Sequence, residues 1–252
     1  MVYPLDRGWP VTGLNEHEPE AKDWDVEDKD QWRGYLFVSR ILARHLRDNP
    51  GSKLSELSLD THQLLTGISC RIFDAAENSE QNDLITILSQ PGFTRLDLSL
   101  YCANQIRNDW CSFRSGRLHN ILARAPYIQH ISLFTNIPFI DDPNQDVGQH
   151  FFPLRSIFPV GDWHQLRHFG LSRFHVKTDD LLEFLEALPP TLESVELSFL
   201  LFLPRSGDHH ALVQGMRERL GWHERRVTDQ PKIVVRIELD WELDIGMVVK
   251  DI

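Results

Sequence analysis

The sequence lacks the features typical of membrane, secreted and nucleic-acid-binding proteins. Its longest uninterrupted apolar run is the five residues 199–203, whereas a membrane-spanning helix needs about 20. No apolar signal-peptide stretch follows the first residues. Basic residues are also few, with 26 Lys and Arg against 37 Asp and Glu and a formal net charge of −11. Because a duplex binder needs a net basic face, we expect neither nucleic acid nor a membrane as partner.

Cysteine is scarce as well. The three cysteines, Cys70, Cys102 and Cys111, are an odd number, and the chain contains no Asn-x-Ser/Thr glycosylation sequon. Secreted domains of small size usually carry an even set of cysteines joined in disulfides. The sequence therefore predicts free thiols and an intracellular location, cytoplasmic or nuclear.

The common motifs of enzymes and metal sites are missing. The chain has no glycine-rich phosphate-binding loop, no His-Glu-x-x-His, no Cys-x-x-Cys and no Gly-x-Ser-x-Gly nucleophile elbow. The densest group of metal-ligating residue types is Asp208-His209-His210, which lacks a distant fourth ligand and is better explained as an exposed helix start. We therefore expect no cofactor, no metal and no catalytic residues, and an enzyme is not the favoured interpretation.

Acidic residues concentrate near the N-terminus. Residues 15–30 hold eight acids and two lysines, which is more than half of the whole excess of negative charge. Such a composition cannot bury enough apolar surface to offset the entropy of ordering. We predict an acidic flexible arm over 1–29, one domain over 30–245 and a C-terminal tail over 246–252. The arm is either a solvated tail or a docking segment for a basic partner.

Six segments repeat an apolar-x-x-apolar-x-apolar pattern whose last three positions alternate as in a half-buried strand. They begin at residues 54, 93, 128, 166, 192 and 234. The spacings of 39, 35, 38, 26 and 42 residues mostly exceed the 20–29 of an ordinary leucine-rich repeat. Each unit therefore carries additional loop or helix. Two stretches, 61–80 and 135–162, are long enough to be insertions with a function of their own.

Helical apolar stripes precede most of these segments, at 35–46, 84–88, 118–122, 181–188 and 212–220. Thr178 and Asp208 are expected to cap the last two helices, and Gly221 to end the final one. A unit with one apolar face must stack on its neighbours to bury it. The sequence thus predicts an α/β fold, an irregular leucine-rich-repeat-like solenoid of about six repeats with parallel strands on one face and helices on the other.

If the apolar positions of each strand face inward, the residues between them form three outward columns. The central column comprises Ser58, Asp97, Ser132, Gly170, Glu196 and Glu238. One flanking column comprises Glu56, Arg95, His130, His168, Ser194 and Arg236, and the other comprises Asp60, Ser99, Phe134, Ser172, Ser198 and Asp240. We expect nine of these residues to bind a partner: Ser58, Asp97, Ser132, Glu196, Glu238, Arg95, His130, His168 and Arg236. The alternative is that they are ordinary solvated strand positions.

Several stretches resemble the C-terminal half of fungal F-box proteins: 32–35 (WRGY), 64–73 (LLTGISCRIF), 91–98 (PGFTRLDL), 155–159 (RSIFP), 166–172 (LRHFGLS) and 192–198 (LESVELS). The resemblance covers about residues 30–235. It implies an irregular leucine-rich-repeat fold that selects substrates for an SCF-type ubiquitin ligase. The F-box, a Leu-Pro-led motif that binds the Skp1 adaptor, is not found within residues 1–29. It either lies upstream of this chain or is not used, so a Skp1-type adaptor is not a firm expectation.

Protein recognition is the favoured function, as a substrate-receptor fragment of such a ligase system without its F-box. Two rivals remain open. The insertions 61–80 and 135–162 could build an enzyme or small-ligand site, or the sheet could associate through an open edge into an oligomeric scaffold. A pocket walled by the insertions and holding titratable groups in contact would favour the enzyme.

Overall fold

The computed structural model describes residues 26–59, 67–74, 78–102, 110–137 and 151–237, with side chains from Gly34 onward. The strands are β1 (Glu56–Leu59), β2 (Ile68–Ser69), β3 (Arg95–Tyr101), β4 (His130–Thr135), β5 (His168–Ser172), β6 (His175–Val176), β7 (Ser194–Ser198), β8 (Leu201–Phe202) and β9 (Lys232–Arg236). The α-helices are α1 (Val26–Asp48), α2 (Ser79–Leu88), α3 (Cys111–Arg114), α4 (Arg117–Leu122), α5 (Thr178–Glu186) and α6 (His209–Arg219). Short 3₁₀ turns include η2 (Cys70–Phe73), η4 (Leu154–Ser156), η5 (Val160–Asp162), η6 (Trp222–Glu224) and η7 (Val227–Asp229).

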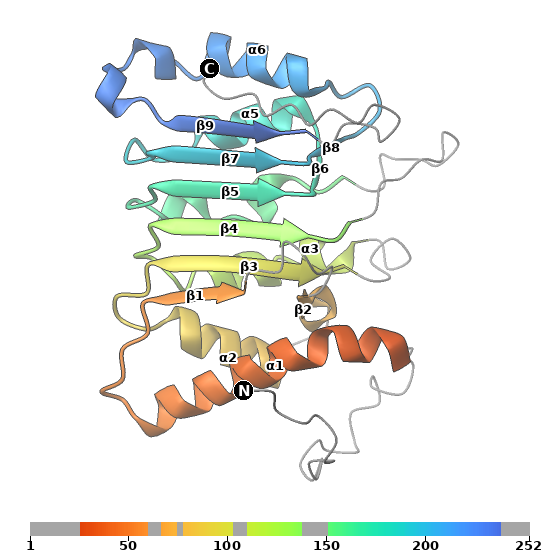
Figure 1. Ribbon diagram of the computed structural model, residues 1–252, viewed down its shortest axis with the longest axis vertical. Helices are drawn as coiled ribbons and strands as arrows, with labels where there is room; N and C mark the ends of the chain where they lie inside the picture. The colour runs from red at the N-terminus through yellow and green to blue at the C-terminus, as the bar shows by residue number, and fades with distance from the viewer. Residues whose placement is uncertain (1–25, 60–66, 75–77, 103–109, 138–150, 238–252) are drawn as a thin grey trace, which may run out of the picture.

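The strands form a seven-stranded parallel sheet in the order β1-β3-β4-β5-β7-β9, with β2 beside the end of β3. A separate pair joins β6 and β8, also in parallel. In Figure 1 the sheet faces the viewer, α5 lies behind it, and α1 and α6 lie beyond its two ends. The expected α/β class with a parallel sheet is thus confirmed. Within the part of the chain that is described, no helix has the length and apolarity needed to cross a membrane.

The core is a set of apolar rows that run across the strands. Residues in equivalent positions of neighbouring strands pair directly, so that Leu98, Leu133, Leu171 and Leu197 form one continuous row. All four are almost completely buried, with exposed fractions of 4%, 1%, 1% and 0%. This confirms the row expected from the sequence. Each leucine is therefore flanked by a leucine of the neighbouring strand, within a core that the helices complete.

The expected register is confirmed from β1 to β7 and wrong for β9. The sequence pattern placed Arg236 beside Ser194 and Glu238 beside Glu196, but Lys232 and Val234 occupy those places. Arg236 instead pairs with Ser198. Apolar residues alternate without a break from Ile233 to Leu239, so two frames four residues apart fit the same pattern. The backbone selects the earlier frame, because Lys232 N–H donates to the Glu193 carbonyl at 2.8 Å as the strand enters the sheet.

The helix ends follow the expected caps in two of three cases. Asp208 caps α6, with its carboxylate accepting from Ala211 N–H at 2.7 Å, and Gly221 adopts the left-handed conformation just after that helix. Thr178 is not the cap of α5, because the capping position is Lys177 and Thr178 is the first helical residue. Its N–H instead donates to the Ser206 carbonyl at 2.9 Å, which fixes the helix start against the β8 turn.

The two insertions are only partly described. In the first, η2 places Cys70 and Phe73 in the core, and in the second, residues 151–162 bury Phe152, Leu154 and Phe158. Residues 61–66 and 75–77 of the first insertion and 138–150 of the second lie outside the described ranges, as do residues 1–25 and 246–252 of the expected arm and tail. Helix α1 begins at Val26, inside the last residues of the expected arm.

Two residues that directly follow strands adopt the left-handed conformation although neither is glycine. Arg173 after β5 has φ 56° and Phe199 after β7 has φ 54°. Arg173 N–H donates to the Ser198 carbonyl, and Phe199 N–H donates to the Arg236 carbonyl. The guanidinium of Arg173 also lies 5.9 Å from the centre of the Phe199 ring. The neighbouring strands β5 and β7 thus both finish, at their carboxyl ends, in a strained left-handed residue.

We predict that Leu171→Ala lowers the free energy of unfolding by about 2–5 kcal/mol, since the cavity it leaves is enclosed by the two neighbouring leucines of the row. Urea unfolding followed by circular dichroism measures this loss. Val227→Ala is the control, because Val227 is 86% exposed and its replacement should cost little. A loss below about half a kilocalorie per mole for Leu171→Ala contradicts the buried row.

Candidate functional site

A groove of about 230 Å³ lies on the sheet face that Figure 1 turns to the viewer, where none of the described helices lies. It crosses β1, β3, β4, β5 and β7. Seven of the nine residues proposed from the sequence line it: Ser58, Arg95, Asp97, Ser132, His130, His168 and Glu196. Arg236 of β9 joins them through an ion pair with Glu196. Glu238, the ninth, lies outside the described residues.

The first half of the groove is an ion-paired cluster on β3 and β4. Arg95 and Asp97 project from the same face of β3, two residues apart, and their Nε and Oδ2 atoms lie 2.8 Å apart. The other carboxylate oxygen of Asp97 lies 2.8 Å from Nε2 of His130 on the next strand. Both oxygens of Asp97 are therefore occupied. Its exposed fraction is only 15%, so the carboxylate is a fixed part of the groove wall.

The second half continues the chain of hydrogen bonds onto β5 and β7. Oγ of Ser132 lies 3.4 Å from Nε2 of His130 and 3.3 Å from Nε2 of His168. Nδ1 of His168 in turn lies 2.8 Å from Oγ of Ser194. A single hydrogen-bonded network thus crosses four adjacent strands. Parallel pairing in register makes this possible, because it places equivalent side chains one strand spacing, about 4.8 Å, apart.

The two histidines of the network are direct partners in the sheet register, and their rings stack. The ring centres are 4.0 Å apart and the planes differ by 12°. Stacked imidazoles at this distance repel each other when both carry a proton. The stacking therefore disfavours a doubly protonated pair.

The same arrangement shifts two pKa values. Burial raises the pKa of Asp97, but hydrogen bonds and positive charge from His130 and Arg95 outweigh it, and the pKa falls to about 2. Burial also lowers the pKa of His168 to about 4, and the positive charges of His130 and Arg95 add to this effect, although Asp97 opposes it. At neutral pH the groove therefore presents an ionised carboxylate on β3 and the neutral imidazole of His168 on β5, with His130 of β4 between them.

Gly170 gives the groove its depth. It stands in the central column between Ser132 and Glu196, and the groove lacks a side chain there. A Cβ atom at this position would collide with Oγ of Ser132 and come within 3.3 Å of Nε2 of His168. The glycine thus leaves room both for the Ser132 hydroxyl to reach His168 and for an atom of a bound partner.

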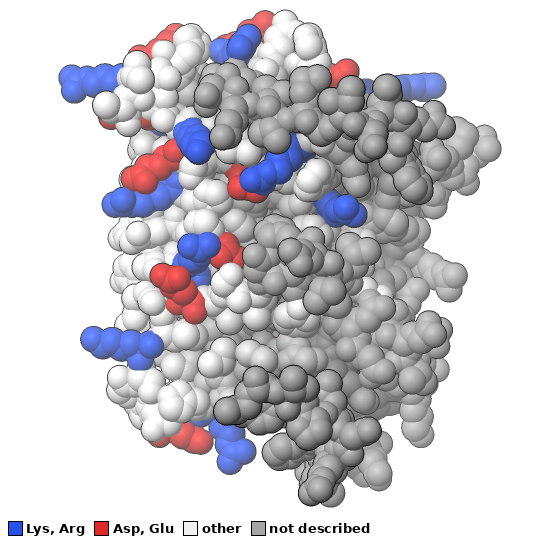
Figure 2. All heavy atoms as spheres, in the orientation of Figure 1, with Lys and Arg blue, Asp and Glu red and all other residues white. Residues whose placement is uncertain are grey.

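The far end of the groove is closed by a second charged cluster. Arg236 pairs with Oε1 of Glu196 and lies 3.1 Å from Oγ of Ser198, which itself lies 3.3 Å from Glu196. Glu196 and Arg236 remain 33% and 46% exposed. Figure 2 views this face, and acidic and basic side chains are intermingled over the part of it that is described. The groove thus carries both signs of charge rather than one.

The network does not have the geometry of a nucleophilic triad. Asp97 and Ser132 both approach Nε2 of His130, so the ring cannot pass a proton from the serine while the acid holds its other nitrogen. His168 does contact hydroxyls through both nitrogens, but both partners are serines, and within the described ranges no carboxylate is hydrogen-bonded to the ring. Among the described residues, no three His, Cys, Asp or Glu side chains are grouped to hold a metal ion.

Sequence reasoning placed the columns but missed some contributors. Six column residues that were not proposed as site residues take part: Ser99, Phe134, Gly170, Ser172 and Ser198 line the groove, and Ser194 contacts His168. The alternation pattern does not separate them from ordinary solvated strand positions. The described residues of the two insertions do not line the groove. The expected free thiols are confirmed. Cys70 and Cys102 are buried, with their Sγ atoms 3.3 Å apart, and Cys111 is exposed.

No model of a known protein family matches this chain. Neither a curated protein nor a solved structure matches it significantly. The site must therefore be interpreted from its own geometry.

We predict that His168 makes the stability of the fold depend on pH. Its pKa of about 4 lies below the ordinary 6.5, so between these pH values the unfolded chain binds a proton that the folded chain does not. Stability therefore falls as the pH is lowered from about 6.5 towards 4. Urea unfolding at pH 7 and pH 5 should show a smaller loss for His168→Gln than for the unmodified chain.

The matched control is His210→Gln on the exposed surface of α6, which should retain the full pH-dependent loss. If His168→Gln loses as much stability between the two pH values as the control does, the imidazole of His168 is not the group responsible.

Proposed function

We propose that this chain is a leucine-rich-repeat-like recognition module that binds a protein partner through the grooved strand face of its sheet. The observation that carries the proposal is the groove itself. It is lined by the outward columns of five adjacent strands, and its floor is left open by Gly170. Stacked strand units with one uncovered face commonly use that face for partners.

The electrostatics of the groove support recognition over catalysis. Its charged groups are already paired: Asp97 with Arg95 and His130, and Glu196 with Arg236. Paired charges of opposite sign fix side chains in place and present an ordered pattern of donors and acceptors. Such a pattern mainly sets the specificity and the encounter rate of a protein–protein contact, because a mismatched partner leaves buried charges without compensation.

The identity of the partner is a separate part of the proposal. The resemblance of residues 30–235 to the C-terminal half of fungal F-box proteins supports a substrate of an SCF-type ubiquitin ligase. This support is independent of the groove geometry. Co-purification of a Skp1-type adaptor with the natural full-length protein tests the ligase role, whereas variants of the groove test recognition itself.

A charge swap tests the groove without removing an ion pair. Glu196→Arg combined with Arg236→Glu keeps opposite charges adjacent on β7 and β9 but reverses their order. We expect the swapped protein to unfold within about 1 kcal/mol of the unmodified chain, because both residues are partly exposed. Partners are co-purified with the tagged chain from its native host and quantified by mass spectrometry. The amount of each partner should be at least about tenfold lower for the swapped protein.

The control reverses two acids on the opposite side of the molecule, with Glu183→Lys and Glu186→Lys on the exposed face of α5. Retention of the same partners by this variant, together with their loss in the swapped groove, supports the proposal. The reverse result makes the helical side the binding surface. If a small molecule is recovered from the purified protein and is no longer recovered from Gly170→Ala, the ligand is a small polar molecule rather than a protein.

A further inference from the structure

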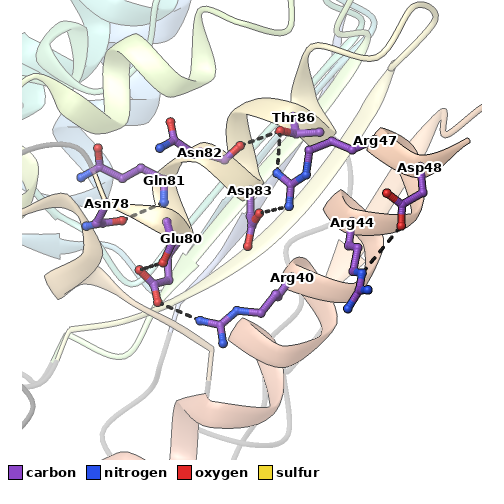
Figure 3. A network of polar contacts seen from close by, with 11 residues as sticks. Arg40, Arg44, Arg47, Asp48, Asn78, Glu80, Gln81, Asn82, Asp83 and Thr86 are labelled. Carbon is purple, nitrogen blue, oxygen red and sulfur yellow. Dashed lines mark hydrogen bonds and ion pairs between the residues drawn. The ribbon is translucent and has the colours of Figure 1, made fainter. Parts of the chain in front are cut away.

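Helix α1 has an inner and an outer apolar face. Its inner face buries Ser39, Ala43 and Leu46 at exposed fractions of 3%, 0% and 7%. It packs against α2, and Figure 3 shows the ion pairs that join the two helices. Arg40 lies 3.3 Å from Glu80, and Arg47 lies 2.9 Å from Asp83, whose side chain is 7% exposed. These contacts fix which face of α1 points away from the domain.

The outer face carries an uncovered apolar patch, which we define as Phe37, Val38 and Ile41. Their exposed fractions are 64%, 42% and 50%. The other large apolar side chains that are exposed in the described part of the chain, Tyr127, Val227 and Ile237, lie on separate elements. Single exposed apolar residues are ordinary, but three within two turns of one helix indicate a binding surface.

Cations border this patch. Arg44, one turn beyond Ile41, is 81% exposed, and its pairing with Asp48 at 3.6 Å is a surface contact of little strength. The side chain of Arg40 is 43% exposed. A segment that covers the patch should therefore combine apolar side chains with negative charge.

Residues 1–25 of this chain have that composition and directly precede α1. Residues 1–14 hold a single acid, Asp6, which the neighbouring Arg7 balances. Their apolar residues include Val2, Tyr3, Leu5, Trp9, Val11 and Leu14. Residues 15–25 add Glu16, Glu18, Glu20, Asp23 and Asp25 against Lys22 alone. The apolar half matches the patch, and the acidic half matches its cationic border.

The distance is short enough for the segment to reach. From Val26 to Phe37 the helix rises eleven residues at about 1.5 Å each, or about 16 Å. An extended chain covers about 3.3 Å per residue, so about five residues suffice to reach the patch. About twenty residues then remain to lie on it. We propose that residues 1–25 bind the outer face of α1, with Trp9, Val11 and Leu14 against the patch and the acids near Arg40 and Arg44.

A double-mutant cycle in the full-length chain tests this contact. The segment variant carries Trp9→Ser, Val11→Ser and Leu14→Ser, and the patch variant carries Phe37→Ser and Ile41→Ser. Trypsin cleaves after Arg7 and Lys22, so its initial rate at these sites reports whether the segment is bound. We expect each variant to raise that rate about tenfold, and the combined variant to raise it no further, because both remove the same contact.

Two additional variants keep the outcome decisive. Arg44→Glu changes only an exposed charge and should also speed cleavage, by an amount that shrinks at high salt. Val227→Ser, at an exposed site on η7, should leave the rate unchanged. If the combined variant raises the cleavage rate by the product of the two separate increases, the segment and the patch act independently and the proposal is wrong. A full-length dimer that the patch variant converts to monomer also overturns it, because a second copy would then be the occupant.

Discussion

Parallel strand pairing without any shift in register is the constraint on which this molecule depends. From β1 to β7, every strand places its first outward residue beside the first outward residue of its neighbour. A slip of one residue would turn each buried leucine of the row towards solvent. The apolar rows therefore hold the register, and the register holds the position of every side chain on the opposite face.

The groove is a consequence of this arrangement rather than a separate construction. His130 stacks on His168 because the two residues are register partners, and Asp97 reaches His130 because it stands one strand and two residues away. The network therefore needs no loop to position it. The core holds its strands in place. The pKa of His168 falls mainly because the ring is buried, whereas the pKa of Asp97 falls, against its own burial, because His130 and Arg95 bond to it.

Much of this could be read from the sequence, because period-two alternation predicts both faces of a strand at once. The buried row at Leu98 to Leu197 and the columns from Ser58 to Glu196 follow from it directly. The frame of β9 did not, because alternation continues past Arg236 and a pattern cannot choose between two frames that it fits equally. The stacking and the hydroxyl contacts of Ser132 also could not be predicted, since they depend on distances of a few tenths of an ångström.

The left-handed turns at Arg173 and Phe199 mark the boundary between the strands, whose register is fixed, and the connections that follow them. Each turn directs the chain out of the sheet as soon as the strand has made its last ladder contact. Connections that leave from this edge can therefore lengthen or shorten without moving the strands. The connection between β4 and β5 spans residues 136–167, and His130 and His168 are still in register. A segment inserted into such a connection therefore leaves the strands, and with them the geometry of the groove, unchanged.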